Sequence, residues 1–317
     1  MYILGIDIGG TKTIVGVADE SGELLAHKRI ETPNVLGPTV NIGNIKAAAR
    51  EVIEESGREI AAIGIGCGGP LDRKTGVLDK VPNLPGWQGI CLTGVFSEEF
   101  GAPAYLDNDA TAAALGEAMF GAGKGVENLA YLTVSTGIGG GIIINGRPYR
   151  GFGDNAGEFG HMKILPDGPA CNCGDRGCLE ALASGTSIAR IAREGLAAHP
   201  GSSLNECDAV TAEAVARAAR DGDHYASQVW RDAMQHLGLG VTNVVNALNP
   251  RMVILGGGVT KAGDMVFEPV RKTVSERAMK PLAADVEIVP AANGDLVGLM
   301  GAFAVAMESF SSRKHEN

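Results

Sequence analysis

The 317-residue sequence lacks features that would assign it to several other classes of protein. No stretch reaches the roughly 18 uninterrupted apolar residues that are needed to cross a bilayer. Positive charge is also in deficit, with 27 lysines and arginines against 37 aspartates and glutamates and a formal net charge of −10. No basic field is therefore available to bind a nucleic-acid backbone. We expect neither a membrane nor a nucleic acid as a partner.

The N-terminus shows no secretion signal, because Met1 is followed directly by an apolar run, without a basic segment or a small-residue cleavage site. We therefore expect a cytoplasmic protein. Thiols stay reduced in that compartment, so the six cysteines need an explanation other than disulfides. With 45% hydrophobic and 20% charged residues, the chain is long enough to form two domains with large cores.

Two similar hairpins are predicted, one at the N-terminus and one near the middle of the chain. In the first, glycines separate the apolar runs 2–8 and 14–18. In the second, the apolar runs 129–134 and 142–144 flank the glycine-rich segment 135–141. Because one unusual hairpin occurs twice, we expect a duplicated α/β domain.

Strands and helices alternate along the rest of the chain. Apolar periodicity predicts a helix with its buried face at 45–53, a strand at 60–65, mostly helix at 184–248, strands at 252–255 and 286–289, and a helix at 296–310. Such alternation is typical of largely parallel sheets flanked by helices. We predict a small N-terminal domain, 1–108 plus about 299–317, and a larger C-terminal domain, 109–298.

Three glycine loops, each after a predicted strand, form a candidate phosphate site. They are Asp7-Ile8-Gly9-Gly10-Thr11-Lys12, Thr136-Gly137-Ile138-Gly139-Gly140-Gly141 and Leu255-Gly256-Gly257-Gly258-Val259. Glycines let the backbone approach a phosphate closely, although a tight hairpin also needs them. The spacing differs from a Walker loop and from a dinucleotide fingerprint. Three such loops can together surround a triphosphate.

Asp7 lies at the end of a predicted buried strand. In phosphoryl transfer, a strand-end carboxylate often holds the metal ion that neutralises the phosphates, so Asp7 is the candidate Mg2+ ligand. A strand-end aspartate is also a common turn residue or helix cap, and this interpretation depends on its neighbours.

The segment Asp107-Asn108-Asp109 stands between an apolar run and the alanine-rich helix expected at 112–120. Active-site residues are common at such strand-to-helix junctions in α/β folds. Asp109 is the candidate general base for an attacking substrate hydroxyl, and Asn108 is a candidate substrate ligand. Asp and Asn are also preferred helix caps, and Asp107 is the candidate cap.

Four potential metal ligands, His161, Cys171, Cys173 and Cys178, fall within one short loop. They suit a closed tetrahedral zinc site, which leaves no position for water and is therefore structural. Buried structural thiols and a redox pair are the alternatives. The other cysteines lack such neighbours and are predicted to be small core residues. They are Cys67, Cys91 and Cys207.

Two glutamates flank this cysteine loop. Glu158 lies three residues before His161, and Glu180 lies two residues after Cys178. A bound zinc ion would hold both carboxylates in place, and carboxylates accept hydrogen bonds from sugar hydroxyls well. Either glutamate alone would ordinarily be a surface charge.

The three glycine loops resemble those of the superfamily that contains actin, the hexokinases and heat-shock chaperones. A narrower resemblance, to the ROK family of sugar kinases and repressors, rests on Asp7-Ile8-Gly9-Gly10-Thr11, Asn108-Asp109, Glu158-x-x-His161 and Cys171-x-Cys173-Gly174-x-x-Gly177-Cys178-x-Glu180. It runs from residue 3 to about 305. The resemblance implies an actin/hexokinase-like (ribonuclease H-like) duplicated α/β fold, with ATP and sugar in the interdomain cleft.

The resemblance also assigns roles to individual residues. Asp109 matches the catalytic base, and His161 would both coordinate zinc and contact the sugar. The positions that match hexose ligands are Gly69, Asn83, Asn108, Glu158, His161 and Glu180. The positions on the nucleotide side are Thr11, Lys12, Thr136, Gly137 and Gly257, and we assign Asp7, Gly9, Gly10 and Gly256 to the same cofactor.

Within the family, the segment Val81-Pro82-Asn83-Leu84-Pro85-Gly86-Trp87 is most similar to bacterial glucokinases. The activity implied is phosphorylation of the glucose 6-hydroxyl by Mg·ATP. The alternatives are another hexose or N-acetylhexosamine (N-acetylglucosamine, N-acetylmannosamine, mannose or fructose), a sugar-responsive repressor, and an actin-like or chaperone ATPase. A repressor would need a helix-turn-helix segment, for which we expect no room before Tyr2. A homodimer or higher homo-oligomer is the family expectation.

Overall fold

The computed structural model describes residues 1–316, and side chains as far as residue 310. Its contacts divide the chain into two compact units. The first unit comprises Met1–Gly125, Gly141–Ala156 and the residues from Ala292 on, and the second comprises Val126–Gly140 and Gly157–Ala291. Among residues 1–316, no helix combines the length and the apolar character that crossing a membrane requires.

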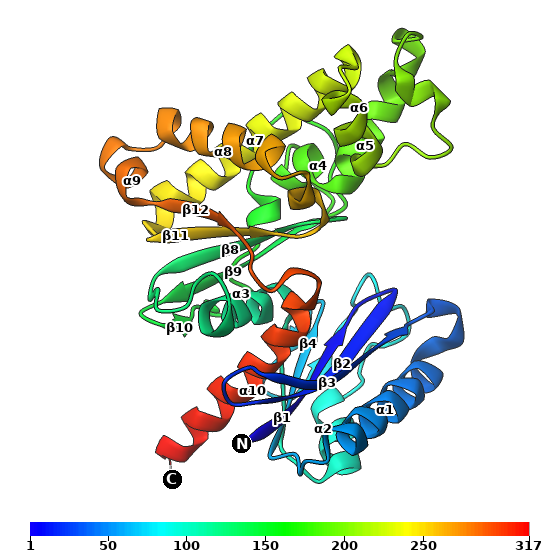
Figure 1. The fold of residues 1–317 in the computed structure, drawn as a ribbon, viewed down its shortest axis with the longest axis vertical. Helices are drawn as coiled ribbons and strands as arrows, with labels where there is room; N and C mark the ends of the chain where they lie inside the picture. Colours follow the sequence, from blue (N-terminus) through cyan, green and yellow to red (C-terminus); the bar gives the residue numbers. More distant parts are fainter. Residues whose placement is uncertain (317) are drawn as a thin grey trace. The chain divides into compact units, whose positions relative to one another are not determined.

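The sheet of the first unit has the strand order β3-β2-β1-β4-β7 (Figure 1). The strands are β1 (Tyr2–Ile8), β2 (Lys12–Asp19), β3 (Leu24–Glu31), β4 (Ala62–Cys67) and β7 (Ala104–Asn108). Strands β1, β2 and β3 pair antiparallel, whereas β4 is parallel to both β1 and β7. The carboxyl ends of β1, β4 and β7 therefore meet at one edge, where Ile8, Cys67 and Asn108 are in register.

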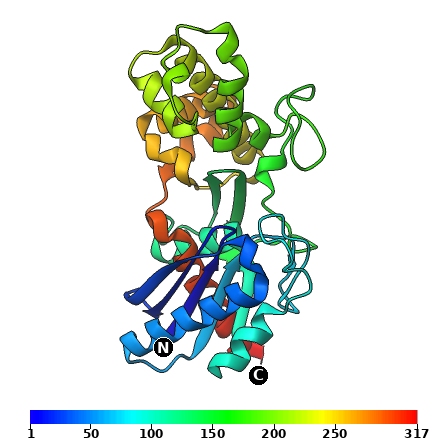
Figure 2. The same ribbon diagram turned by 90° about the vertical axis from the view of Figure 1, so that its right-hand side faces the viewer.

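A row of glycines lets the last helix approach this sheet. Gly16, Gly5 and Gly64 are neighbours across β2, β1 and β4. Helix α10 (Val297–Glu316) packs on them so closely that a Cβ at Gly64 would lie 1.7 Å from the carbonyl oxygen of Ala302. Side chains alternate along a strand, so Leu4, Ile6 and Ile8 point to the opposite face, where helix α1 (Gly37–Ser56) contributes to their core. Figures 1 and 2 show α1 and α10 on opposite faces of the sheet.

The remaining elements of the first unit are short. They include the paired strands β5 (Leu71–Asp72) and β6 (Val77–Leu78), and the helices α2 (Leu92–Phe100) and α3 (Asp109–Phe120). Helix α1 ends at Ser56, and its C-cap Gly57 adopts the left-handed conformation, which glycine permits. In α3, the fully buried Glu117 accepts hydrogen bonds from the backbone N–H groups of Ala122, Ala292 and Asn293. One carboxylate thus fixes two distant segments of chain.

The second sheet has the order β10-β9-β8-β11-β12. Its strands are β8 (Leu129–Val134), β9 (Ile138–Ile144), β10 (Arg147–Pro148), β11 (Met252–Gly256) and β12 (Glu287–Pro290). The helices of the second unit are α4 (Leu179–Ala183), α5 (Gly185–Gly195), α6 (Ala212–Arg220), α7 (His224–Leu248), α8 (Asp264–Arg277) and α9 (Lys280–Asp285). Both sheets place the first strand of a hairpin at the centre, with two parallel strands beyond it. This repetition confirms the predicted duplicated α/β fold.

Two features differ from the expectations. Strand β3 is not predicted, because only Ala26 of its eight residues is buried and most others are polar and exposed. The division between the units also differs from the predicted boundary after residue 108. Helix α3 packs on α10, so 109–125 belongs to the first unit, together with 141–156.

Candidate functional site

The junction of β7 and α3 carries the candidate base and its neighbours. Asn108 is the N-cap of α3, since its Oδ1 accepts the backbone N–H groups of Ala110 at 3.0 Å and Thr111 at 3.3 Å. The prediction that Asp107 is the cap is therefore wrong. The helix occupies Oδ1 of Asn108 and leaves its Nδ2 facing Gly69, where a Cβ would lie 3.3 Å from that nitrogen.

Asp107 is instead part of a buried ion pair. Its Oδ2 accepts hydrogen bonds from Nε of Arg150 at 2.9 Å and from a terminal nitrogen of the same guanidinium at 2.6 Å, while its Oδ1 accepts the N–H of Asn108. Burial raises the pKa of Asp107, and the positive charge of Arg150 opposes that rise. The role of Arg150 is not predicted from the sequence, because its only signal is one arginine before a glycine-rich turn, 43 residues from its partner.

Asp109 begins α3 and is exposed to solvent. Its Oδ1 accepts the backbone N–H of Ala110, and its Oδ2 would lie 3.9 Å from a Cβ at Gly68. Protein still surrounds this carboxyl closely enough that desolvation raises its pKa. A carboxylate that is accessible and more basic than usual suits a general base.

Asp7, at the end of β1, is a second carboxylate at the same edge of the sheet. Burial, followed by the negative charge of Asp109, raises the pKa of Asp7 to about 7, and the charges of Lys12 and Arg29 oppose this. Cys67 lies between them at the end of β4, and its thiol pKa is raised by burial and then by both carboxylates. A bound divalent cation would offset the negative charge of Asp7. The carboxylate oxygens of Asp7 are donors of the kind that Mg2+ prefers.

The first glycine loop packs against the predicted sugar loop. A Cβ at Gly10 would lie 2.6 Å from the carbonyl oxygen of Asn83, so only glycine permits this approach. The N–H of Gly9 donates to the carbonyl of Lys12, which closes the tight hairpin. Both interpretations of the loop are therefore compatible with its geometry. Thr11 and Lys12 are exposed, and their roles remain predictions.

In the second unit, the four potential zinc ligands converge. Their donor atoms all lie within 4.8 Å of one another. The Sγ atoms of Cys173 and Cys178 are 3.7 Å apart, and Sγ of Cys171 is 3.8 Å from Nδ1 of His161. Zinc–sulfur bonds of 2.3 Å in a tetrahedron give an edge of about 3.8 Å. Donor chemistry and spacing therefore fit a closed zinc site.

The two nitrogens of His161 face different partners. Nδ1 points to the cysteines, whereas Nε2 is 3.8 Å from Oε2 of Glu158. The Glu158 side chain is 62% exposed and thus accessible to a ligand. This arrangement is compatible with the expected double role of His161, in which one nitrogen binds metal and the other faces the sugar.

The second and third glycine loops are adjacent within this unit. Gly257 has a positive φ of 92°, and a Cβ there would lie 2.5 Å from the carbonyl oxygen of Val134, at the end of β8. Gly256 packs equally closely on Tyr131. Glu180 reaches the second loop, where it accepts the N–H of Ile138 at 2.8 Å. Thr136 is exposed, and its role stays a prediction.

Each unit thus gathers its own set of predicted residues. The first unit holds Asp7, Gly9, Gly10, Gly69, Asn83, Asn108 and Asp109. The second holds Gly137, Glu158, His161, Glu180, Gly256, Gly257 and the three cysteines. The prediction for the isolated cysteines is correct for the fully buried Cys67 and wrong for Cys91 and Cys207, which are only half-buried. Sγ of Cys91 instead accepts the N–H of Gly94 and caps α2.

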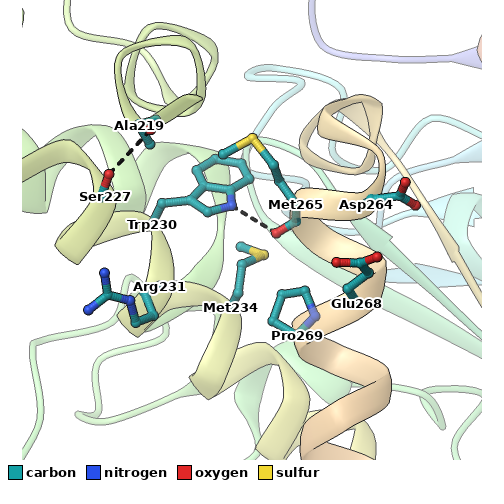
Figure 3. A pocket seen from close by; sticks show the side chains of 9 residues that line it. All are labelled: Ala219, Ser227, Trp230, Arg231, Met234, Asp264, Met265, Glu268 and Pro269. Carbon is teal, nitrogen blue, oxygen red and sulfur yellow. Dashed lines mark hydrogen bonds between the residues drawn. The ribbon is translucent and has the colours of Figure 1, made fainter. Parts of the chain in front are cut away.

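A separate cavity of about 350 Å³ lies between α7 and α8 (Figure 3). Trp230 and Met234 line it from α7, and Met265 and Pro269 line it from α8. The indole N–H of Trp230 donates to the carbonyl of Met265, and this hydrogen bond holds the indole ring in place in the folded protein. None of the residues predicted to bind sugar, nucleotide or metal lines this cavity.

Comparison with known proteins gives the family. The model of the ROK family matches residues 3–309. This chain belongs to the ROK family. A glucokinase from Thermotoga maritima is 36% identical over 313 residues, which cover 97% of this chain and 98% of the relative.

Two further similarities bear on function within the ROK family. The crystal structure of a ROK glucokinase from Streptomyces griseus in complex with glucose and AMPPNP is 34% identical, with a TM-score of 0.83 over 97% of this chain and 100% of that one. The xylose repressor of Caldicellulosiruptor bescii is 32% identical over 257 residues, 80% of this chain and 64% of the repressor. These similarities confirm the actin/hexokinase-like fold class, and the similar proteins include both a kinase and a regulator.

Proposed function

We propose that this ROK protein is an ATP-dependent sugar kinase that phosphorylates glucose at its 6-hydroxyl. The observation that carries the proposal is the exposed carboxylate of Asp109, whose raised pKa makes it a better base. Directly beside it, Asn108 directs Nδ2 towards Gly69. The glucokinase relatives, including the one solved with glucose and AMPPNP, support this substrate and donor.

In the proposed reaction, Asp109 accepts the proton of the 6-hydroxyl as the oxygen attacks the γ-phosphorus of ATP in line, and the bond from that phosphorus to the β,γ-bridging oxygen breaks to release ADP. Nδ2 of Asn108 donates a hydrogen bond to a sugar oxygen, and Glu158, Glu180 and Nε2 of His161 serve as the other polar sugar ligands. The glycine loops receive the phosphates. Mg2+ would neutralise phosphate charge, and Asp7 is the residue we propose to hold it.

The roles proposed for the cysteines are structural. Three thiolates and Nδ1 of His161 would fill the zinc coordination sphere and leave no site for a reacting water. Zinc would therefore fix the loop that presents Glu158 and Glu180 rather than take part in phosphoryl transfer. We also propose a homo-oligomeric state, which is common for proteins of this kind.

A sugar-responsive regulator is the second candidate, and the 32% identity to a xylose repressor favours it. A regulator would bind a sugar without turnover and would bind DNA. Within the kinase class, mannose, fructose and the N-acetylhexosamines remain candidate substrates, because one added or missing group changes binding by only about 1–3 kcal/mol in a pocket.

The test is ADP release from Mg·ATP with a panel of glucose, mannose, fructose, N-acetylglucosamine and N-acetylmannosamine. We expect turnover that depends on glucose and falls by about 10²- to 10⁴-fold in Asp109→Asn. Asp208→Asn, at an exposed aspartate of the second unit, serves as a control that should keep wild-type turnover. Preference for another sugar would correct the substrate. Sugar binding without ADP release on any sugar would replace the kinase by the regulator.

A further inference from the structure

Glu180 contacts the glycine loop assigned to the nucleotide, although the sequence assigns this glutamate to the sugar. Its Oε2 accepts the backbone N–H of Ile138 at 2.8 Å. A Cβ at Gly137 would lie 2.4 Å from the same oxygen, so the carboxylate rests directly on the backbone of that loop. Glu180 thus holds one end of the segment 135–138.

The other end of this segment is held by the same helical region. The N–H of Gly185, the first residue of α5, donates to the carbonyl of Ser135 at 2.7 Å. The carbonyl of Glu180 in turn accepts the N–H of Ser184 and the hydroxyl of Ser187. The segment from Glu180 to Gly185 therefore contacts the glycine loop at Ile138 and at Ser135. Hydrogen bonds to the carbonyl of Glu180 also stabilise the segment itself.

The helical region begins at a potential zinc ligand. Cys178 is fully buried and is the N-cap residue of α4, only two positions before Glu180. The N–H of Leu179 donates to the carbonyl of Met162, which follows the ligand His161. Helix α4 has just five residues, so a displacement of Cys178 would be transmitted to Glu180.

We infer that the zinc site and the nucleotide loop are coupled, with Glu180 as the positioning residue that links metal occupancy to nucleotide affinity. This inference rests on the proposed function, because the glycine loop receives its nucleotide role there. With the four ligands joined by zinc, Cys178 and α4 are fixed and Glu180 holds the N–H of Ile138. Without zinc, the cross-link between residues 161 and 178 is lost, and the carboxylate is no longer held on the loop.

The first test measures Mg·AMPPNP binding by titration calorimetry in the absence of sugar. The samples are zinc-loaded wild type, wild type stripped by a chelator, Cys173→Ser and Cys207→Ser. Cys173 is an exposed ligand, whereas Cys207 lies outside the cluster and is the matched control. We expect AMPPNP to bind stripped protein and Cys173→Ser at least about fivefold more weakly, the lower range for coupled sites, with no change in Cys207→Ser.

Glu180→Ala identifies the route of coupling. In this variant zinc should still bind, but the AMPPNP affinity should be the same with and without the metal. Persistence of the full zinc effect in Glu180→Ala would overturn the role of Glu180. Equal AMPPNP affinity of loaded and stripped wild type would overturn the coupling and leave the kinase proposal intact. Failure of loaded wild type to bind AMPPNP at all would overturn the proposed function itself.

A second measurement uses only folded, zinc-loaded protein. Coupling between two binding sites is reciprocal, so nucleotide must also strengthen the hold on zinc. We expect saturating Mg·AMPPNP to slow the transfer of zinc to a chromogenic chelator by at least about fivefold in wild type, and not in Glu180→Ala. An unchanged rate in wild type would refute the coupling even if metal removal unfolds the protein.

Discussion

Replacing Arg150 by methionine should destabilise the first unit by about 3–5 kcal/mol, the usual cost of removing one partner from a buried ion pair. The side chains of Asp107 and Arg150 are only 4% and 11% exposed, and two hydrogen bonds join them. Without the guanidinium, the Asp107 carboxylate keeps the N–H of Asn108 and remains buried. Methionine preserves much of the apolar stem of arginine, so the loss reports the charge.

The assay exploits the two tryptophans, one in each unit. In a Trp230→Phe background, the fluorescence of the fully buried Trp87 reports urea unfolding of the first unit alone. Arg50→Met is the matched control, because Arg50 pairs with Glu99 while its own side chain is 59% exposed. An ion pair with one solvent-exposed partner should contribute less than about 1 kcal/mol.

The pH dependence gives a second, independent check. Burial already raises the pKa of Asp107, and loss of Arg150 must raise it further. A carboxyl whose folded pKa exceeds its unfolded value favours the fold at low pH and costs stability as pH rises through the folded pKa. The penalty of Arg150→Met should therefore be largest near neutral pH and shrink as pH falls towards 4. A penalty under about 1 kcal/mol, or one that is independent of pH, would refute the argument from charge burial.

Three further predictions concern the base, the metal and a buried carboxylate. The acidic limb of the kcat/KM profile should lie above the free-aspartate pKa of about 3.9, because desolvation raises the pKa of Asp109; a limb at or below that value would contradict the assignment. Cys173→Ser should lose its zinc on dialysis while Cys207→Ser retains it, as measured by elemental analysis. Glu117→Ala should cost about 3 kcal/mol or more in urea unfolding, because three backbone N–H groups lose their buried acceptor; a loss below about 1 kcal/mol would show that water replaces the carboxylate.

Local patterns account for the elements and ligands that the sequence predicts correctly. The apolar runs of β1 and β8 specify buried strands, and the spacing of the cysteines brings four donors together within one loop. Strand β3 escapes prediction because it lies at the edge of its sheet and buries only Ala26.

Interactions between distant residues could not be predicted in the same way. The choice of Asn108 over Asp107 as the helix cap depends on Arg150, which pairs with Asp107 from 43 positions along the chain. In the sequence, Glu117 is likewise indistinguishable from an ordinary helical glutamate. Its role becomes apparent only in the fold, where the backbone N–H groups of 292–293 donate to it. In both cases the side chain's role is set by a partner that periodicity cannot identify.

The cap at Asn108 fixes the polarity that this side chain can offer to a ligand. The amide oxygen already accepts hydrogen bonds from the backbone of α3, so the side chain directs only its N–H donors towards Gly69. The complementary atom of a bound molecule must then be an acceptor. Aspartate at this position would cap the helix equally well, but it would direct a carboxylate oxygen, which only accepts hydrogen bonds, to the place where the amide Nδ2 now donates them. A substitution that folding tolerates would thus invert the chemical preference of the site.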